Sequence, residues 1–264
     1  MKQTNNIDVY EFPKAKGIVV SGDIHGDFTQ LVFKCCMQYR LTETLIIVAG
    51  DCGFGFERLG YYEGVYKKCC NRLAKANNWL LFVRGNHDNP AYFNVEPLKH
   101  QRWMTLADYS VVKACGHSIL CVGGATSVDR ILRMTAKQYH LPNPSQPLAP
   151  NMYWKDETPF FDKSRLDMLD EMCAIDTVIT HTSPSFCELS SYQGLENWAE
   201  HDEDLICDVQ HERKVMDDLK AYLCSKNHPL HHWFYGHFHQ SWHAEIDDVH
   251  YNMLDIMELR ELRC

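Results

Sequence analysis

Five short segments between residues 22 and 239 each place metal-binding side chains directly after an apolar run. The segments are Gly22-Asp23-Ile24-His25-Gly26, Gly50-Asp51, Gly85-Asn86-His87-Asp88, Thr180-His181-Thr182 and Gly236-His237-Phe238-His239. The apolar runs read as β-strands, and open α/β sheets bind their ligands at the carboxyl ends of strands. One such segment alone is typical of a turn. Repeated five times in order, the pattern predicts a sheet whose strand ends share one metal site.

The side chains of these segments favour divalent metal ions over a nucleophilic residue. They comprise three aspartates, one asparagine and five histidines. Carboxylate and imidazole groups suit Zn, Fe, Mn and similar ions, and there are more of them than one tetrahedral site can use. Two ions about 3.5–4 Å apart lower the pKa of a bound water and hold the oxygens of an in-line displacement. The set therefore predicts a dinuclear centre for phosphate ester hydrolysis.

The order Asp-x-His, Gly-Asp, Gly-Asn-His-Asp, His and Gly-His-x-His resembles that of the calcineurin-like metallophosphoesterase superfamily, and the motifs bracket residues 23 to 239 of 264. The resemblance implies an α/β fold of four layers, an αββα sandwich of mixed sheets, with the metals at the C-terminal ends of the strands. It also implies a hydroxide that bridges two divalent ions and attacks phosphorus in line. Mn, Fe, Zn and Ni are all expected candidates, because they accept the same nitrogen and oxygen donors.

The same resemblance implies a role for each of these side chains. One ion would be held by Asp23, His25 and His239. The other would be held by Asn86, His181 and His237, with Asp51 as the bridge. His87 would protonate the leaving alkoxide, and we also assign Asn86 to substrate binding.

Elementary chemistry bears on two of these roles. A bridging ligand must be a carboxylate, because a neutral imidazole cannot hold two cations against their mutual repulsion, and Asp51 meets this requirement. A histidine near two divalent ions has a depressed pKa, so a protonated His87 needs an acidic neighbour. We expect Asp88 to be that neighbour, which would make it a catalytic residue.

The second motif departs from the family pattern. Many members carry another Asp or Asn three residues after the bridging aspartate, and the phosphoprotein phosphatases continue with an arginine. Here Phe54 replaces the carboxylate that would orient His87, and Gly55 replaces the arginine. A serine/threonine protein phosphatase is the alternative function: Gly-Asp-Ile-His-Gly and Arg84 favour it, whereas Gly55 argues against it.

Apolar periodicity predicts alternating strands and helices along the chain. The predicted strands span 17–21, 44–49, 79–83, 177–180, 232–235 and 249–255, with a hairpin formed by 109–114 and 118–122. The predicted helices span 28–39, 61–76, 166–173 and 215–223. The βαβαβ opening predicts a largely parallel sheet with right-handed crossovers.

Two irregular stretches, near 125–160 and 186–210, interrupt this pattern. Four prolines between Pro142 and Pro150 exclude regular structure there, and the acidic second stretch reads as a solvated face. We expect one domain over residues 1–264, with these stretches as cap or loop insertions that select the substrate. Arg130 is expected to direct a guanidinium at the phosphate, the alternative being a surface arginine paired with Asp129.

The amino-acid composition limits the classes of molecule that the protein is expected to bind. The net charge of −9 provides no basic field for nucleic acid, which argues against a nuclease. A phosphate ester, either a small molecule or a phosphopeptide, is therefore the expected partner, and no feature indicates an oligomeric state. Outside the enzymes, a nucleotide- or metal-sensing binding module would use the same pocket but would not need His87.

Location is predicted from cysteine usage and hydropathy. Twelve cysteines occur without any C-x-x-C spacing, and two adjacent pairs fall within predicted helices. No apolar run approaches the roughly 20 residues of a membrane span, and the first thirteen residues lack a secretory signal pattern. These features predict a cytoplasmic protein without a membrane partner.

Overall fold

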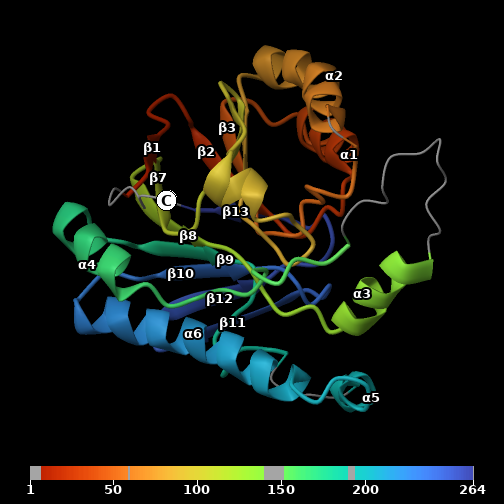
Figure 1. Cartoon of the computed structure of the whole chain (residues 1–264). Coiled ribbons are helices and arrows are strands. Elements are labelled where there is room, and N and C mark those ends of the chain that lie inside the picture. The colour runs from red at the N-terminus through yellow and green to blue at the C-terminus, as the bar shows by residue number, and fades with distance from the viewer. Residues whose placement is uncertain (1–6, 59, 140–151, 190–193, 264) are drawn as a thin grey trace.

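A computed structural model describes residues 7–58, 60–139, 152–189 and 194–263. In these residues two β-sheets lie face to face, with helices outside them (Figure 1). One sheet has the order β1 (Val9–Glu11), β7 (Ser110–Ala114), β8 (His117–Val122), β9 (Thr177–Thr180), β10 (His232–Tyr235), β12 (Val249–Met253) and β11 (Trp242–Ile246). The other has the order β13 (Leu259–Leu262), β2 (Gly17–Ser21), β3 (Thr44–Val48), β4 (Trp79–Phe82), β6 (Trp103–Thr105) and β5 (Lys99–His100).

Parallel strands occupy the middle of each sheet. The runs β2–β3–β4–β6 and β8–β9–β10–β12 are parallel. Antiparallel pairs lie toward the edges, where β13 pairs with β2, β5 with β6, β7 with β8 and β11 with β12. Both sheets are therefore mixed, as predicted.

Helices cover the outer faces of the sheets (Figure 1). The described helices, in chain order, are α1 (Phe28–Phe33), the π-helix η1 (Lys34–Gln38), α2 (Tyr61–Ala76), the π-helix η2 (Ala91–Val95), α3 (Arg130–Tyr139), α4 (Lys163–Met172), α5 (Leu195–Ala199) and α6 (Leu205–Ser225), of which α3 and α5 lie beside the sandwich (Figure 1). Helices α1 and α2 lie on the six-stranded sheet, and α4 and α6 on the seven-stranded one. Within the described ranges, none of these helices combines the length and apolar character needed to cross a membrane.

Strand β3 shows why the central strands are continuous apolar runs. Leu45 and Ile47 point into the core between the sheets, where they join Phe234 of β10. Ile46 and Val48 point to the opposite face and pack against α1 and α2. Parallel strands covered on both faces lose the usual alternation of apolar and polar residues. The predicted four-layer αββα sandwich is confirmed.

The predicted elements are confirmed with several corrections. The helix predicted at 215–223 is the later part of α6, and the strand predicted at 249–255 is followed by one more strand, β13. Strands β1, β5, β6, β11 and β13 were not predicted. They are short and lie at or near sheet edges, so their apolar pattern is weak and pairing with a neighbour defines them.

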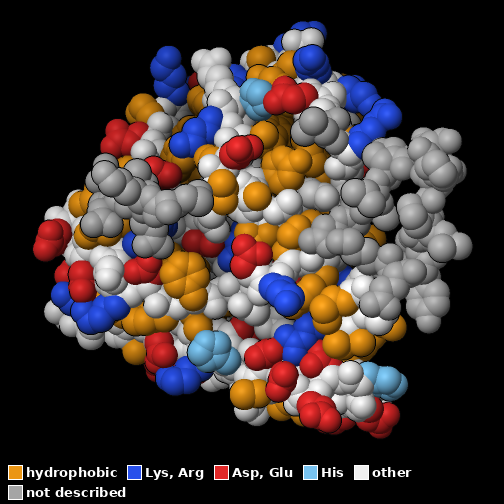
Figure 2. Space-filling model, in the orientation of Figure 1, with side chains coloured by type: hydrophobic (Ala, Val, Ile, Leu, Met, Phe, Trp, Pro, Cys, Tyr) orange, Lys and Arg blue, Asp and Glu red, His pale blue; other side chains and the backbone are white. Residues whose placement is uncertain are grey.

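The two irregular stretches contain α3 and α5, while the prolines at 142–150 lie outside the described residues. Acidic side chains gather over α5 and the start of α6 (Figure 2). Glu196, Glu200, Glu203 and Asp204 are exposed, as a solvated face requires. Asp202 is the exception, because it is buried against Arg130.

Candidate metal centre

Five strand ends deliver the candidate ligands to one edge of the sandwich. Strands β2, β3 and β4 lead into the turns that carry Asp23, Asp51 and Asn86. Strand β9 leads to His181, and β10 leads to the His237–His239 turn. Because these strands run parallel within each sheet, their C-terminal ends meet at the same edge.

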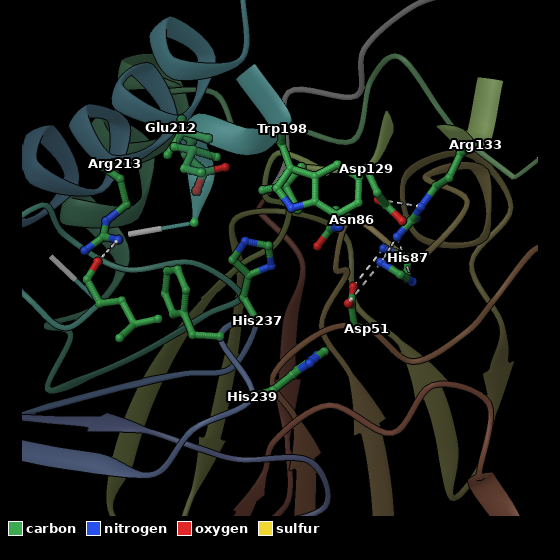
Figure 3. Close-up of a pocket in the computed structure, with 16 residues that line it drawn as sticks. Asp51, Asn86, His87, Asp129, Arg133, Trp198, Glu212, Arg213, His237 and His239 are labelled. Carbon is green, nitrogen blue, oxygen red and sulfur yellow. Dashed lines mark hydrogen bonds and ion pairs between the residues drawn. The ribbon is translucent and has the colours of Figure 1, made fainter. Parts of the chain in front are cut away.

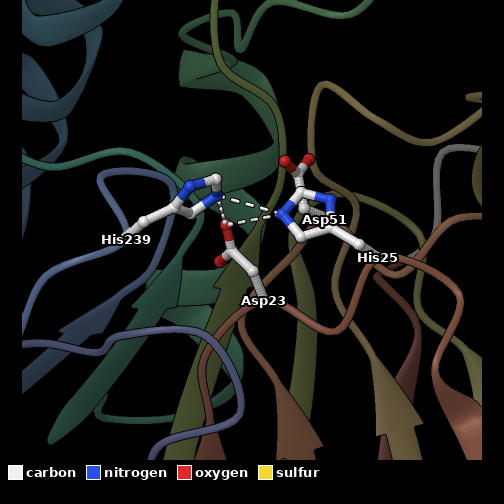
Figure 4. A group of neighbouring side chains, drawn as sticks. All are labelled: Asp23, His25, Asp51 and His239. Atoms are coloured by element: carbon white, nitrogen blue, oxygen red, sulfur yellow. Dashed lines mark hydrogen bonds and ion pairs between the residues drawn. The ribbon is translucent and has the colours of Figure 1, made fainter.

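Left-handed backbone conformations orient several of these ligands. The φ angle is 42° at His25, 44° at Asp51, 69° at His237 and 51° at His239. Residues other than glycine rarely adopt such angles, and they concentrate at functional sites. The His237 amide donates a hydrogen bond to Asp23 Oδ1 at 3.0 Å, which ties two of the turns together. The turns direct His25 and His239 toward Asp23 (Figure 4).

Two glycines make room for the ligands. A Cβ atom on Gly236 would lie 2.1 Å from Asp23 Oδ1, and one on Gly50 would lie 2.1 Å from His181 Nδ1. Gly50 also has a φ of 99°. Any side chain at either position would displace a ligand, which explains the glycine before Asp51 and His237.

Asp23, His25, Asp51 and His239 form one group of potential metal ligands (Figure 4). One ligand atom from each lies within 4.8 Å of the others. His239 Nε2 lies 3.0 Å from both Asp23 Oδ2 and His25 Nε2. Asp23 is fully buried, yet its Oδ2 accepts no hydrogen bond of good geometry from the described residues. A buried carboxylate oxygen without a donor, beside two imidazole nitrogens, fits a divalent cation.

Asn86, His181 and His237 form a second group, and Asp51 lies between the two groups. His181 Nε2 is 3.1 Å from Asp51 Oδ1 and 3.0 Å from Asn86 Oδ1. The rings of His181 and His237 have centroids 5.0 Å apart. His181 Nδ1 lies 2.8 Å from the Ala49 carbonyl. That contact assigns the proton to Nδ1 and leaves Nε2 free to bind a cation.

Charge and burial set the protonation of the centre. Burial raises the pKa of Asp51, but His181 and His87 lower it more, so the pKa lies well below its ordinary value. Burial, together with His181, lowers the pKa of His237 well below its ordinary value. The ionised Asp51 and the neutral His237 are therefore in the forms that bind metal. Burial lowers the pKa of His181, but Asp51 and Asp23 raise it to about 10, so a bound ion would displace a proton from His181.

A buried relay orients Asn86. Its Nδ2 donates to Ser127 Oγ at 2.9 Å, and Ser127 Oγ donates to Glu157 Oε2 at 2.7 Å. The Ser127 amide also donates to Glu157, at 2.7 Å to Oε1. Because the Asn86 amide nitrogen is occupied, its Oδ1 faces His181. Burial raises the pKa of Glu157 to about 8.

His87 lies beside the two groups and faces the cavity described below (Figure 3). Its amide donates to Asp51 Oδ1 at 2.7 Å, and its Nε2 lies 3.9 Å from Asp51 Oδ2. The Arg133 guanidinium contacts the His87 ring. The pKa of His87 is lowered, mainly by burial and also by the charge of Arg133. The Asp51 carboxylate raises this pKa but does not offset the other two effects.

The role predicted for Asp88 is corrected. Its carboxylate is fully buried and accepts hydrogen bonds of 2.8–3.0 Å from the amides of Cys52, Gly53, Phe54 and Gly85. Asp88 thus holds the turn after Asp51, and its hydrogen bonds go to backbone amides rather than to His87. The acidic group that faces His87 is Asp51 itself.

Arg130 is expected to face the phosphate, but Arg133 lines the cavity in its place. Arg130 is bound by Asp202 at 2.5 and 2.9 Å and by Asp208 at 2.5 Å, and it does not line the cavity. Arg133 lines the cavity, pairs through Nε with Asp129 at 2.8 Å, and has an Nη1 without a hydrogen-bond partner among the described residues. The four-residue spacing of Asp129 and Arg133 is the sequence signal for their pairing on one helical face.

The structure explains two sequence features that bear on the resemblance to protein phosphatases. Phe54 is fully buried and packs on Phe28, Tyr62 and Phe93 with ring centroids 4.9–5.7 Å apart, so it fills the core in place of a carboxylate. Arg84, the feature that favoured a protein phosphatase, is buried and donates to Asp108 and to backbone carbonyls. It supports the fold and does not line the cavity.

A cavity of about 540 Å³ opens over the candidate metal ligands (Figure 3). Both irregular stretches contribute to its wall. Val128, Asp129 and Arg133 come from the first, and Leu189, Leu195 and Trp198 from the second. Ser127 and Trp198 are residues whose roles the sequence pattern did not predict.

A protein family and several solved structures are similar to this chain. A family model for calcineurin-like phosphoesterases matches residues 17–241. A search of curated proteins found no significant match. Similar solved structures include the protein TT1561 of Thermus thermophilus (14% identity, TM-score 0.48, covering 94% of this chain and 98% of that chain). Another is phosphopantetheinyl hydrolase from Mycobacterium tuberculosis (12% identity, TM-score 0.37, covering 93% of this chain and 96% of that chain). A third is a dimetal phosphatase from Danio rerio (10% identity, TM-score 0.44, covering 92% of this chain and 88% of that chain).

The two-sheet fold, the Asp–His cluster and the family match define a hydrolase that acts on phosphoric ester bonds. The chain belongs to the calcineurin-like phosphoesterase family, because the match spans most of its length. The resemblance seen in the order of the motifs is confirmed.

Proposed function

We propose that the chain hydrolyses phosphate esters at a dinuclear metal centre. Asp23, His25 and His239 would hold one divalent ion, Asn86, His181 and His237 the other, and Asp51 would bridge them. The observation that carries this proposal is the contact of Asp51 with ligands of both groups. Bound ions would activate a water as nucleophile and withdraw charge from the phosphoryl oxygens. Mn, Fe, Zn and Ni all suit these donors.

The chain's own residues would then orient the ester and supply a proton to its leaving group. Arg133 offers a guanidinium beside the proposed metal ligands, where it would bind a phosphoryl oxygen. His87, on the same wall, would donate a proton to the leaving alkoxide. Residues 125–160 and 186–210 would act as insertions of a single domain that enclose the organic part of a small substrate.

Adding metal to chelator-treated protein is expected to stabilise it. Mn²⁺ at 100 times its Kd should raise the free energy of unfolding by about 2.7 kcal/mol, which corresponds to a Tm increase of roughly 5–11 °C for a chain of this size. Differential scanning fluorimetry measures the shift. Asp23→Asn should reduce it, because Asp23 Oδ2 is the orphaned ligand atom. If the Tm of the wild-type protein did not change when Mn²⁺ was added, this result would contradict the proposed metal centre.

Ser127→Ala is expected to weaken metal binding about 10–100-fold, the range typical of lost outer-shell partners. The substitution removes the acceptor that fixes the Asn86 amide. Competition with a chromophoric chelator measures the affinity. Ser185→Ala is the matched control, because Ser185 also donates to a carboxylate, that of Asp217, but on the surface. Equal affinities in both variants would refute the orienting role of Ser127.

His87→Ala is expected to affect poor leaving groups most. For an alkyl phosphate, kcat should fall about 10²–10⁴-fold, the usual contribution of a general acid. For 4-nitrophenyl phosphate, whose leaving group needs no proton, the loss should be roughly tenfold or less. Steady-state kinetics on both esters tests the assignment, and equal losses would show that His87 is not the acid.

A further inference from the structure

The cavity has two chemically different ends (Figure 3). Arg133 and His87 lie at one end, and Arg213 and Glu212 lie at the other. His237 and Asn86 lie between the two ends (Figure 3). The apolar side chains of the lining are Val128, Leu189, Leu195, Trp198, Val209 and Phe238.

The two charged side chains at the far end are already committed to the protein. Arg213 donates to the carbonyls of Pro184, Cys187 and Leu189 at 2.7–3.3 Å, and its guanidinium lies 5.2 Å from the centroid of the Phe238 ring. Glu212 accepts hydrogen bonds from the Thr126 amide and from the Thr182 hydroxyl. These bonds to the protein reduce what either side chain can offer a ligand hydroxyl or amide that gives up its bonds to water here.

Trp198 provides a large aromatic surface in the middle of the cavity, between the two charged ends (Figure 3). It comes from α5, is 38% exposed and lines the cavity. In Figure 3 its indole lies on the side of the cavity opposite His239. Aromatic rings pack well against such a surface in offset or edge-to-face geometry. A volume of about 540 Å³ is within the range of small-molecule sites.

Resting on the proposed phosphoesterase function, we propose that the ligand is a small phosphate ester whose organic group is apolar and aromatic, and that Trp198 is the specificity residue that contacts this group. The phosphate occupies the end lined by Arg133 and the metal ligands. The ring contacts Trp198, next to the phosphate, and extends along the apolar lining toward Phe238. Sugar phosphates, nucleotides with polar base edges and phosphopeptides are selected against, because the described side chains around the organic group are mainly apolar.

A binding measurement tests the proposal without any turnover. Calorimetry on the Mn²⁺-loaded protein compares benzylphosphonate with methylphosphonate, which share one head group. We expect benzylphosphonate to bind about 100-fold more tightly, because a phenyl ring leaves water. Trp198→Ala should reduce this preference to about tenfold or less, and Trp198→Phe should restore most of it. Leu132→Ala is the control and should keep the full preference, because Leu132 on α3 is 58% exposed and outside the cavity lining. Equal affinities for the two phosphonates in the wild-type protein would overturn the proposal.

A kinetic comparison separates this proposal from the hydrolase function on which it rests. Benzyl phosphate and glucose 6-phosphate both release a primary alcohol, so the chemistry of bond cleavage is closely matched. We expect kcat/KM to be about 30-fold or more higher for benzyl phosphate, and equal or better turnover of glucose 6-phosphate or adenosine 5′-monophosphate would overturn the proposed specificity. Metal-dependent turnover of all three at one rate would refute the specificity alone. A phosphonate preference without hydrolysis of any ester would support the aromatic site and refute the hydrolase.

Discussion

Asp51→Asn is expected to lower kcat/KM for an aryl phosphate by about a thousandfold or more and to reduce the bound metal to at most one equivalent. A neutral amide cannot hold two cations close together against their repulsion. The fold should persist, because the amide oxygen can still accept the hydrogen bond that Asp51 Oδ1 now receives from the His87 amide at 2.7 Å. Kinetics with 4-nitrophenyl phosphate, elemental analysis and thermal unfolding together measure these effects.

Asp176→Asn is the matched control for this experiment. Asp176 precedes β9, whereas His181 follows it, so the two lie at opposite ends of one strand. Its carboxylate accepts hydrogen bonds at 2.7 Å from the Ser118 amide and from His117 Nδ1. The control should lose stability but keep kcat/KM within about twofold, since no group at the site depends on it. Wild-type turnover by the Asp51 variant would remove the basis of the proposed mechanism.

Arg133→Ala is expected to lower kcat/KM about 10²–10³-fold, the effect of losing one preorganised charge-assisted donor. Arg133 is 7% exposed and is held by Asp129, so its guanidinium is fixed before a substrate arrives. The inhibition constant of inorganic phosphate should rise in the same variant. Arg133→Lys should recover only part of the activity, because a lysine cannot reproduce the planar fork.

Arg130→Ala provides the comparison within the same helix. It should lower kcat/KM by less than about fivefold, because its guanidinium is bound by Asp202 and Asp208. It should lower Tm, since the buried Asp202 would lose its partner. A larger kinetic loss for Arg130 than for Arg133 would return the phosphate-binding role to Arg130.

The apolar runs before the ligand motifs located the central strands with little error. Strands buried on both faces need continuous apolar residues, so 17–21, 44–48 and 177–180 could be identified from local pattern alone. Edge strands such as β11 and β13 could not, because their identity depends on pairing with β12 and β2.

Asp88 and Arg130 illustrate the limit of local reasoning. Asp88 follows His87 directly, yet the turn directs its carboxylate into the amides of residues 52–54. Arg130 and Arg133 both lie in the first turn of α3 in the same sequence context. Only the position of Asp202, 72 residues further along the chain, decides which guanidinium is occupied.

The sequence by itself determined the set of candidate metal-binding side chains and the strand ends that carry them, because a side chain at a strand end is fixed by local pattern and by the common direction of parallel strands. The pairing of two sheets around these strand ends appears only in the tertiary structure. The tertiary structure alone decided which arginine faces the centre, what orients Asn86, and which side chains line the far end of the cavity. These depend on contacts between segments distant in sequence, and no local periodicity encodes such contacts.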